Sequence, residues 1–336
     1  MDTETEEFPV ALPWVRISGA ISYTVLSAIG IIMNCFLATV LYKGRKSFRK
    51  NAFFTITWQI LAFDLMNHTV AFFIAIPLTL TGYNIYGNSL FYLIVCAFET
   101  FSYAGTLVLS FVMTMNRITV FILPSANQFL FHKHLHPVLI SAWLLDTAFV
   151  AVWSAFGCYK NFNTGGFYYE HYCPADKQVG KSIRVMFVDV TTWLPVIMFV
   201  TYIVMLIFIK FKLDFAVSGG KIVRKEQANQ SVGSNMKMEF QLLAQAFLIC
   251  GFLEVESIVF NVIPQVHVEG QWIYLINFIG SCTSLLLSCI HPLILFTFNT
   301  EIRGRLFNLF GSTKVVGLGN SGTSVASVQG LRRGTV

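Results

Sequence analysis

The sequence predicts an all-α membrane protein: a seven-transmembrane helix bundle with its N-terminus outside and a short interfacial helix after span seven. Composition supports this, because 55% of the residues are hydrophobic and only 12% are charged, whereas soluble domains carry about 25% charged residues. Several apolar segments are also long enough to cross the ~30 Å hydrocarbon core as helices. Finally, lysine and arginine are unevenly distributed between the connecting segments, which sets an orientation.

The apolar segments are expected to be helices, because a chain in lipid must satisfy its backbone hydrogen bonds internally. They lack the alternation of about ten residues that is typical of a transmembrane β-strand. The connecting segments leave no room for a soluble domain. The predicted spans are residues 19–42, 52–80, 90–115, 136–157, 183–209, 239–262 and 272–298.

The segments that flank the seven spans complete the domain organisation. We expect residues 1–18 to be an extracellular tail and 19–299 to be the transmembrane domain. Residues 300–311 place apolar side chains opposite Arg303 and Asn308, which predicts an amphipathic juxtamembrane helix. Residues 312–336 are rich in Gly, Ser and Val, which predicts a disordered cytoplasmic tail. The acidic start of the chain argues against a cleavable signal peptide, so the first span should direct insertion.

Charge predicts the orientation of the bundle. The loop at 43–51 reads KGRKSFRKN, and further basic residues lie after spans three, five and seven. Cytoplasmic loops collect lysine and arginine, so these segments should be inside and the N-terminus outside. The expected location is the plasma membrane, with sensory neuron cilia as a narrower possibility. Scattered membrane-proximal basic residues indicate lipid headgroups as partners and give no support for nucleic acid. The opposite side holds only Arg16, Lys160, Lys177, Lys181 and Arg184.

Three cysteines are expected on the outer side of the membrane. Cys158 and Cys173 bracket the outer loop after span four, and Cys96 lies about two turns inside span three. An oxidising compartment favours a disulfide there. We favour the pair Cys158–Cys173, with Cys96–Cys173 as the alternative, because connectivity cannot be deduced from sequence alone.

Polar residues inside the spans are costly, so they are expected to face the bundle interior. Asn34 and Asp64 lie in spans one and two, and His291 precedes Pro292 in span seven. Asp64 is either a hydrogen-bonded structural carboxyl or a small-cation or protonation site coupled to conformation. We assign these residues to an intramembrane polar core.

A second set of polar residues, all acidic, lies in the outer halves of the spans: Glu99, Asp146, Asp189, Glu254 and Glu256. With no lysine pointing inward, they predict an outward-opening cavity of negative potential. Glu254 and Glu256 cannot share a helix face. Aromatic residues nearby suit a small amphipathic or cationic ligand, with a short peptide as the alternative. The expected ligand-binding residues are Glu99, Tyr103, Asp189, Trp193 and Glu254.

Several landmarks, taken in order, resemble the rhodopsin-like receptors coupled to G proteins. Asn34, the Leu-Ala-Phe-Asp segment ending at Asp64, Asn116-Arg117-Ile118, Trp143, Pro195 and His291-Pro292 stand where that family has its motifs. The departures are Asn116 in place of an acid, His291 in place of an asparagine, and no Cys-Trp-x-Pro motif in span six. The Met-Asn-Arg end of span three, the Gly-Cys…Cys outer loop and HPLILFTFNTEIR resemble the nematode serpentine chemoreceptors, class X in particular.

The resemblance implies a chemosensory receptor that activates a heterotrimeric G protein. Arg117 and Asn116 would then form the G-protein coupling site at the inner end of span three. Because Asn116 lacks the negative charge of the usual acid, the resting state should be less restrained and basal signalling measurable. The resemblance also puts Thr106 beside Asp64, and Glu99 where amine receptors hold their ligand-binding aspartate.

Other function classes remain as alternatives. A receptor for a short peptide or an amine transmitter is the nearest, and a membrane transporter or ligand-gated channel belongs to a different class. Paired repeats with broken helices, typical of transporters, are not visible. Span seven contains no lysine for a retinal Schiff base. Neither metal-binding motifs nor a nucleophile elbow are present, so we expect no enzyme, no metal and no cofactor.

Overall fold

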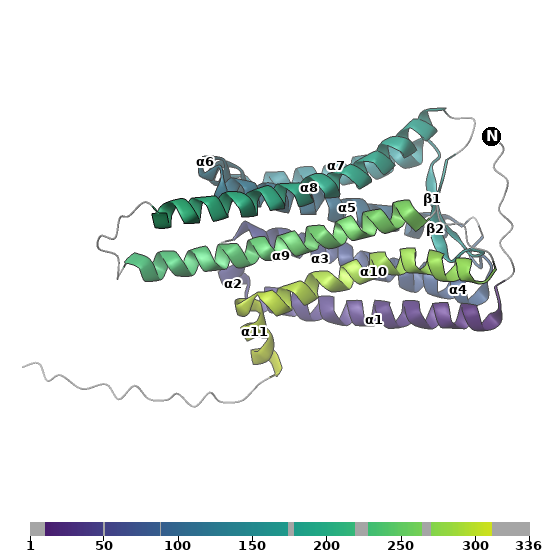
Figure 1. Ribbon diagram of the computed structural model, residues 1–336. Helices are drawn as coiled ribbons and strands as arrows, with labels where there is room; N and C mark the ends of the chain where they lie inside the picture. The colour runs from purple at the N-terminus through teal and green to yellow at the C-terminus, as the bar shows by residue number, and fades with distance from the viewer. Residues whose placement is uncertain are drawn as a thin grey trace, which may run out of the picture.

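The computed structural model describes residues 11–49, 51–87, 89–173, 178–218, 228–263 and 270–310. Within these ranges, seven helices are long and apolar enough to cross a membrane, and they run side by side along the molecule (Figure 1). The predicted seven-helix bundle is therefore confirmed. Their bounds are α1 Pro13–Lys43, α3 Ala52–Val70 continued by η1 Ala71–Ala75 and α4 Ile76–Thr81, α5 Leu90–Phe121, α7 Leu135–Ala155, α8 Gln178–Ser218, α9 Ala228–Val262 and α10 Trp272–Phe298.

Short elements close the two ends of the bundle. One end carries a hairpin of β1 Tyr159–Asn163 and β2 Tyr168–Tyr172, and we call it the hairpin end (Figure 1). The opposite end holds Arg117, and we call it the arginine end. The short helices at the arginine end are α2 Arg45–Phe48, α6 Pro124–Asn127, η2 Gln128–Lys133 and α11 Thr300–Phe310.

Helix α11 confirms the predicted short helix after span seven. It begins where the Asn299 side-chain oxygen accepts hydrogen bonds from the backbone N–H groups of Glu301 and Ile302, at 3.1 and 3.0 Å. Ile302 is buried, whereas Phe307 is exposed, so the helix has one face on the bundle and one face away from it. The predicted tail at 312–336 lies outside the described residues, as does most of the predicted N-terminal tail.

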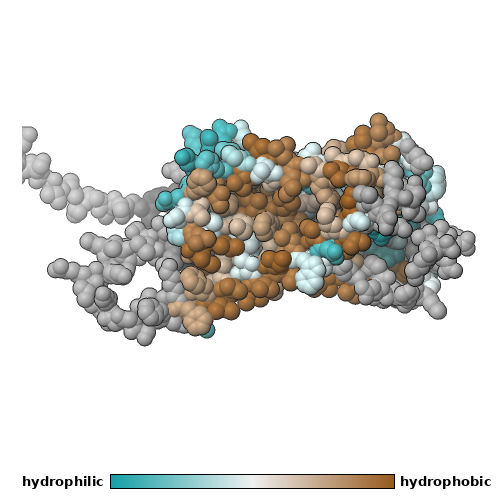
Figure 2. All heavy atoms as spheres, turned by 90° about the horizontal axis from the view of Figure 1, so that it is seen from above, coloured by the Kyte–Doolittle hydropathy of each residue, from teal (hydrophilic) through white to brown (hydrophobic). Residues whose placement is uncertain are grey.

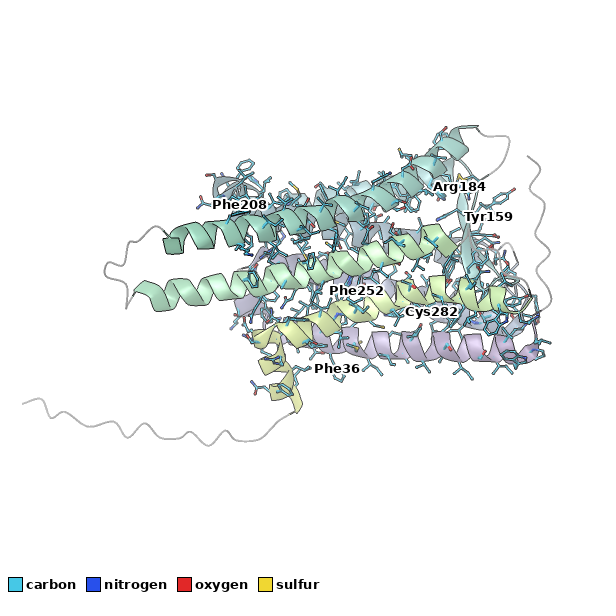
Figure 3. The ribbon with its side chains drawn as sticks, viewed as in Figure 1. Phe36, Tyr159, Arg184, Phe208, Phe252 and Cys282 are labelled. Atoms are coloured by element: carbon cyan, nitrogen blue, oxygen red, sulfur yellow. A yellow bond between two sulfur atoms is a disulfide. The ribbon has the colours of Figure 1, made fainter. Side chains whose placement is uncertain are left out.

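The bundle presents an apolar surface around its middle. Figure 2 shows hydrophobic residues covering most of the central part of one face, with hydrophilic residues gathered toward the ends. Large apolar side chains are exposed on all seven long helices, among them Phe36, Phe208 and Phe252 (Figure 3). Exposed apolar patches of this extent mark a surface that meets lipid, and the chain is a multi-pass membrane protein.

Helix α5 is the central helix of the bundle, and it packs most closely against α3. Gly105 of α5 makes this close approach possible, because a Cβ added there would lie 2.3 Å from the ring of Phe63. The Phe63 ring cannot move aside easily, since it stacks on Trp143 of α7 at a centroid distance of 4.5 Å. Trp143 is held in turn by a 3.0 Å hydrogen bond from its indole N–H to Gln59.

Replacing Gly105 with alanine is therefore expected to destabilise the bundle by about 1–3 kcal/mol through overpacking. Gly251→Ala is the matched control, because a Cβ at this glycine of α9 would meet Phe199 at an ordinary 3.6 Å. The measurement is thermal unfolding of the purified protein, followed with a thiol-reactive fluorophore that reports exposure of the buried cysteines. Equal stability of the two variants would contradict the close approach of α3 and α5.

The β-hairpin is a feature that the sequence analysis did not predict. Its strands pair antiparallel, with Tyr159 opposite Tyr172 and Asn163 opposite Tyr168. The Asn163 side-chain oxygen accepts hydrogen bonds from the N–H groups of Gly165 and Gly166, both at 2.9 Å, which forms the turn. A disulfide joins Cys158 to Cys173 at the open end of the hairpin. This confirms the favoured pairing, and Cys96 is a buried free cysteine.

Candidate functional site

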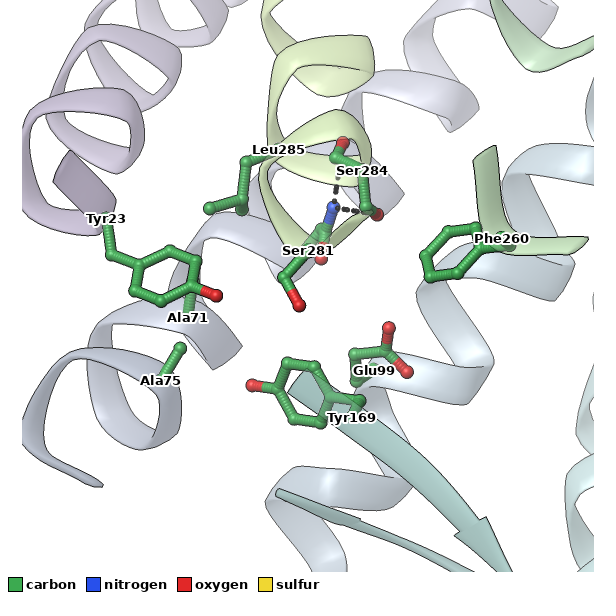
Figure 4. Close-up of a pocket in the computed structure, with 10 residues that line it drawn as sticks. Tyr23, Ala71, Ala75, Glu99, Tyr169, Phe260, Ser281, Ser284 and Leu285 are labelled. Atoms are coloured by element: carbon green, nitrogen blue, oxygen red, sulfur yellow. Dashed lines mark hydrogen bonds between the residues drawn. The ribbon is translucent and has the colours of Figure 1, made fainter. Parts of the chain in front are cut away.

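The hairpin covers a small internal cavity at the hairpin end of the bundle. The cavity has a volume of about 20 Å³, which is room for about one water molecule. Figure 4 shows residues of α1, α5, α9, α10 and β2 converging on it. Its lining residues are Tyr23, Asn67, Ala71, Ala75, Glu99, Tyr169, Phe260, Ser281, Ser284 and Leu285.

The turn of the hairpin is anchored in the bundle by its own backbone. The carbonyl of Phe167 accepts a 2.9 Å hydrogen bond from the Tyr23 hydroxyl and a 3.4 Å bond from the Ser281 hydroxyl. Phe167 is buried and adopts a φ of 59°, a left-handed conformation that is rare for a bulky residue. Its ring packs against Tyr274 at 5.0 Å. Contacts to α1 and α10 thus hold the turn in a strained conformation.

Strand β1 is anchored to α5. The Tyr92 hydroxyl donates to the Asn161 side chain at 2.5 Å and accepts from the N–H of Phe162 at 2.9 Å. Phe162 is itself buried. Together with the bonds at the turn, these contacts make the hairpin a fixed cover over the cavity.

The centre of the site is an ion pair between the cover and the bundle. The Lys160 ammonium of β1 contacts the Glu99 carboxylate of α5, and both side chains are largely buried. The ammonium also lies 5.5 Å from the ring centroid of Tyr169, within cation–π range. The expectation of a site without an inward lysine is therefore wrong, because the hairpin folds inward and carries Lys160 onto Glu99.

Two other titratable groups of the hairpin keep their neutral forms. Burial raises the pKa of the Tyr169 hydroxyl well above its ordinary value. Burial, reinforced by the positive charges of Lys160 and Arg184, holds the pKa of His171 well below its ordinary value. The His171 ring packs on Trp153 at 5.3 Å. Figure 3 shows Arg184 and Tyr159 at this same end of the molecule. The hairpin thus brings the Lys160 ammonium to the bundle interior.

The structure brings some of the predicted ligand-binding residues to this region and not others. Glu99 lines the cavity, and the Tyr103 ring packs between Phe187 and Phe260, at 6.5 and 6.2 Å. Asp189 and Trp193 lie four residues apart on the exposed face of α8, and Trp193 is 62% exposed. They point away from the cavity and toward the surface that meets lipid.

Glu256, rather than Glu254, is the α9 carboxyl that points inward. Glu256 is completely buried, and its oxygens make no well-aligned hydrogen bond among the described residues, although Ser284 lies close enough to interact with it. It is close enough to Glu99 for the two carboxyls to interact electrostatically. Glu254 is only half-buried. Asp146 of α7 is buried, and its oxygens likewise have no partner in the described part of the chain.

A row of buried polar groups runs from the cavity toward the middle of the bundle. The Asn67 amide donates to the Ser284 and Ser288 hydroxyls at 3.2 and 3.1 Å (Figure 4 shows the bonds to Ser284). The Asn34 amide donates to the Ser288 carbonyl at 3.0 Å. These hydrogen bonds join α10 to α3 and to α1, so the polar core links the three helices.

The polar core continues to the pair Asp64 and His291. His291 Nδ1 lies 2.9 Å from the Asp64 carboxylate, and both side chains are buried. Pro292 and Thr106 are buried as well. The predicted residues Asn34, Asp64 and His291 thus take part in polar contacts inside the bundle, and His291 occupies the position next to the carboxylate.

At the arginine end, Arg117 is almost completely buried, with 1% of its surface exposed. Its guanidinium donates to the Asn116 side-chain oxygen at 2.5 Å and lies 5.2 Å from the ring centroid of Phe53. Asn116 in turn donates to Asn127 of α6 at 3.4 Å. A neutral amide therefore makes the contact that an acid makes in the expected motif.

Sequence reasoning missed Lys160, Asn67, Ser284 and Asn127. Asn67, which lies three residues after Asp64, carried a signal, because these positions are neighbours on one helix face. Lys160 carried none, since only the folded hairpin brings it to α5. Among the described residues, no group of three or more His, Cys, Asp or Glu side chains is placed to hold a metal ion.

The fold and the buried polar core define a class, the seven-helix membrane proteins with the rhodopsin fold. Among solved structures, squid rhodopsin aligns over 92% of this chain and 89% of its own, with a TM-score of 0.73 and 13% sequence identity. Residues 24–299 match the family described as serpentine type 7TM GPCR chemoreceptor Srx, and the chain belongs to that family. A search of the curated proteins found no match. The chain is therefore a chemosensory G-protein-coupled receptor, as its sequence predicted.

Proposed function

We propose that the receptor binds a small amphipathic or cationic external ligand beneath the hairpin and activates a heterotrimeric G protein at the arginine end. The observation that carries the proposal is the buried Glu99–Lys160 pair at the cavity. A ligand ammonium is chemically equivalent to the Lys160 ammonium, so it can take the same place beside Glu99. In this arrangement Glu99, Tyr103 and Glu256 form the ligand site, whereas Asp189, Trp193 and Glu254 do not.

The closed cavity supports a conformational mechanism. A space of about 20 Å³ is far smaller than a typical ligand pocket of about 300–1,000 Å³. The ligand must therefore bind a different conformation in which the hairpin or the surrounding helices have separated. A ligand that binds this conformation more tightly shifts the population toward it. The polar core that joins α1, α3 and α10 supports coupling to the arginine end, and linkage requires that the G protein favours ligand binding in return.

The proposed orientation puts the hairpin end and the N-terminus outside the plasma membrane, with sensory neuron cilia as a narrower location. The disulfide of the hairpin supports this, because disulfides persist in oxidising compartments. Accessibility of a tag before Met1 in intact cells tests the orientation. A receptor for a short peptide or an amine transmitter, or a transporter or channel, remains an alternative function. Ligand-evoked current in cells lacking G proteins would favour the last of these.

Arg117→Ala is expected to abolish ligand-evoked signalling while leaving the amount of receptor at the cell surface within about twofold. The reason is that, in the proposed mechanism, helix rearrangement exposes to the G protein the Arg117 guanidinium, which is buried in this conformation. Signalling is measured with a G-protein reporter during a screen of small volatile and water-soluble compounds. The same assay measures basal signalling, which we expect to be detectable because the hydrogen bond that Arg117 donates to the neutral Asn116 amide restrains it less than an ion pair with a carboxylate would.

Arg45→Ala is the matched control, because its guanidinium lies over the Tyr42 ring at 4.7 Å on the exposed surface of the same end. It should leave signalling unchanged. Signalling by Arg117→Ala at normal surface expression would contradict the proposed role of Arg117.

A further inference from the structure

A second and larger cavity lies at the arginine end of the bundle. It has a volume of about 470 Å³ and opens between the first turn of α3 and the junction of η2 with α7. The chemosensory function proposed above makes no use of it. Its lining residues are Arg49, Ala52, Thr55, Phe131, His132, Leu135 and His136.

The polar lining of this cavity consists mainly of hydrogen-bond donors. Arg49 carries a permanent charge with five N–H donors, and the imidazoles of His132 and His136 each offer a ring N–H. None of the lining residues is acidic. The ion pairs found among the described residues lie elsewhere and involve none of these three side chains. The donors therefore face the cavity without an anionic partner from the described part of the chain.

Two helices begin at the wall of the cavity and add to its positive potential. Ala52 and Leu135, the first residues of α3 and α7, both line it, and neither helix has an acidic residue in its first turn. The start of a helix carries a partial positive charge that favours anions, although at the start of α3 the Asn51 side chain already accepts the hydrogen bond of the Phe53 N–H. The basic segment 43–49 ends at this cavity, where Arg49 lines it. The backbone groups and the side chains therefore both favour a negatively charged ligand.

The size and position of the cavity narrow the class of anion. Its volume lies in the range of small-molecule sites and exceeds what a single inorganic ion needs. Phe131 and Leu135 give it an apolar wall. Phe129 and Ile140, on the same two elements, are both 59% exposed, so the cavity lies where the lipid-facing surface begins. A headgroup at the edge of the bilayer can reach it directly.

We propose that this cavity binds a phosphomonoester group and that the group belongs to a phosphorylated inositol lipid in the adjacent leaflet. Arg49 binds the phosphate by two parallel N–H donors, and His132 and His136 donate from the opposite wall. The starts of α3 and α7 supply the remaining positive potential. A soluble phosphorylated sugar shares this chemistry and is the alternative source of the group.

The experiment uses the purified full-length receptor in phosphatidylcholine nanodiscs that contain a fluorescent phosphatidylinositol bisphosphate. Arg49→Gln combined with His136→Gln is expected to weaken binding of this lipid about tenfold, through loss of charge-assisted hydrogen bonds. Arg45→Gln is the control, because it removes an equal charge four residues away, from a side chain that lies over Tyr42 and does not line the cavity. It should change binding less than twofold.

A second variant keeps the test independent of folding. Ala52→Glu puts a carboxylate in the first turn of α3, where the helix dipole favours it, yet it should abolish binding because the carboxylate occupies the anion site. Equal weakening by Arg45→Gln and the Arg49 variant would overturn the proposal in favour of diffuse surface charge. Phosphatidylserine lacks a phosphomonoester, so binding of this lipid by the receptor as tight as that of phosphatidylinositol bisphosphate would overturn the proposal too. Displacement of the lipid by equimolar soluble inositol trisphosphate would support the phosphate site and overturn the lipid as its source.

Discussion

Replacing Lys160 with methionine is expected to destabilise the receptor by about 3–5 kcal/mol, because removal of one partner leaves the Glu99 carboxylate buried without its counter-charge. The variant also loses the cation–π contact with Tyr169. The measurement is thermal unfolding of the purified receptor. Few single substitutions should cost more, since most destabilise a protein by less than about 3 kcal/mol.

The double variant Glu99→Gln with Lys160→Met is the control that separates charge from packing. Neutralising both partners should restore most of the stability, because replacing a buried ion pair by uncharged groups is often close to neutral. If the double variant is as unstable as the sum of the two single variants, the ion pair is not the cause. Lys160→Met should also increase the potency of a cationic agonist, since the agonist no longer competes with a tethered ammonium for Glu99.

Removing the contact between Asp64 and His291 is expected to have the second large effect on the stability of the receptor. Asp64→Ala and His291→Ala should each cost about 3 kcal/mol or more, because each leaves a buried polar group without its partner. The double variant should cost less than their sum, with a coupling energy of about 1–3 kcal/mol in a double-mutant cycle. The cycle is measured by thermal unfolding, as for Lys160. Strict additivity would contradict the contact.

The same pair bears on the sequence-based hypothesis that Asp64 binds a small cation. An imidazole within 2.9 Å of the carboxylate supports a structural partner there rather than a bound small cation. Agonist potency should therefore be the same in sodium and in choline medium. A large shift in potency would support the small-cation site.

The sequence predicted the seven helices because length and apolar composition are properties of each segment alone. It could not predict which face of each helix turns inward. In a membrane helix the face toward lipid and the face toward the bundle are both apolar, so periodicity gives little information on rotation. The sequence therefore could not show that Asp189 and Trp193, which share a face of α8, lie on the exposed side. Nor could it show that Glu256 is buried rather than Glu254.

The loop around the disulfide could be predicted from the sequence in part only. The segments YKNFN and YYEHY flank a turn with two glycines, which is a recognisable hairpin signal. The oxidising compartment predicted a disulfide, and the sequence favoured Cys158–Cys173 while leaving Cys96–Cys173 open. The contact of Lys160 with Glu99 depends on how the hairpin docks on α5, and that is a tertiary property without a local pattern. Asn127 likewise reaches Asn116 only through the position of α6.

The small volume of the cavity under the hairpin has a kinetic consequence. If only a minor open population admits the ligand, the apparent dissociation constant equals the intrinsic one divided by the open fraction. The observed association rate then cannot exceed the opening rate, however concentrated the stimulus. Departure of the ligand must wait for the same opening, so a slow opening would prolong each binding event. A chemoreceptor that opened slowly in this way would integrate a chemical stimulus over time instead of following its rapid fluctuations.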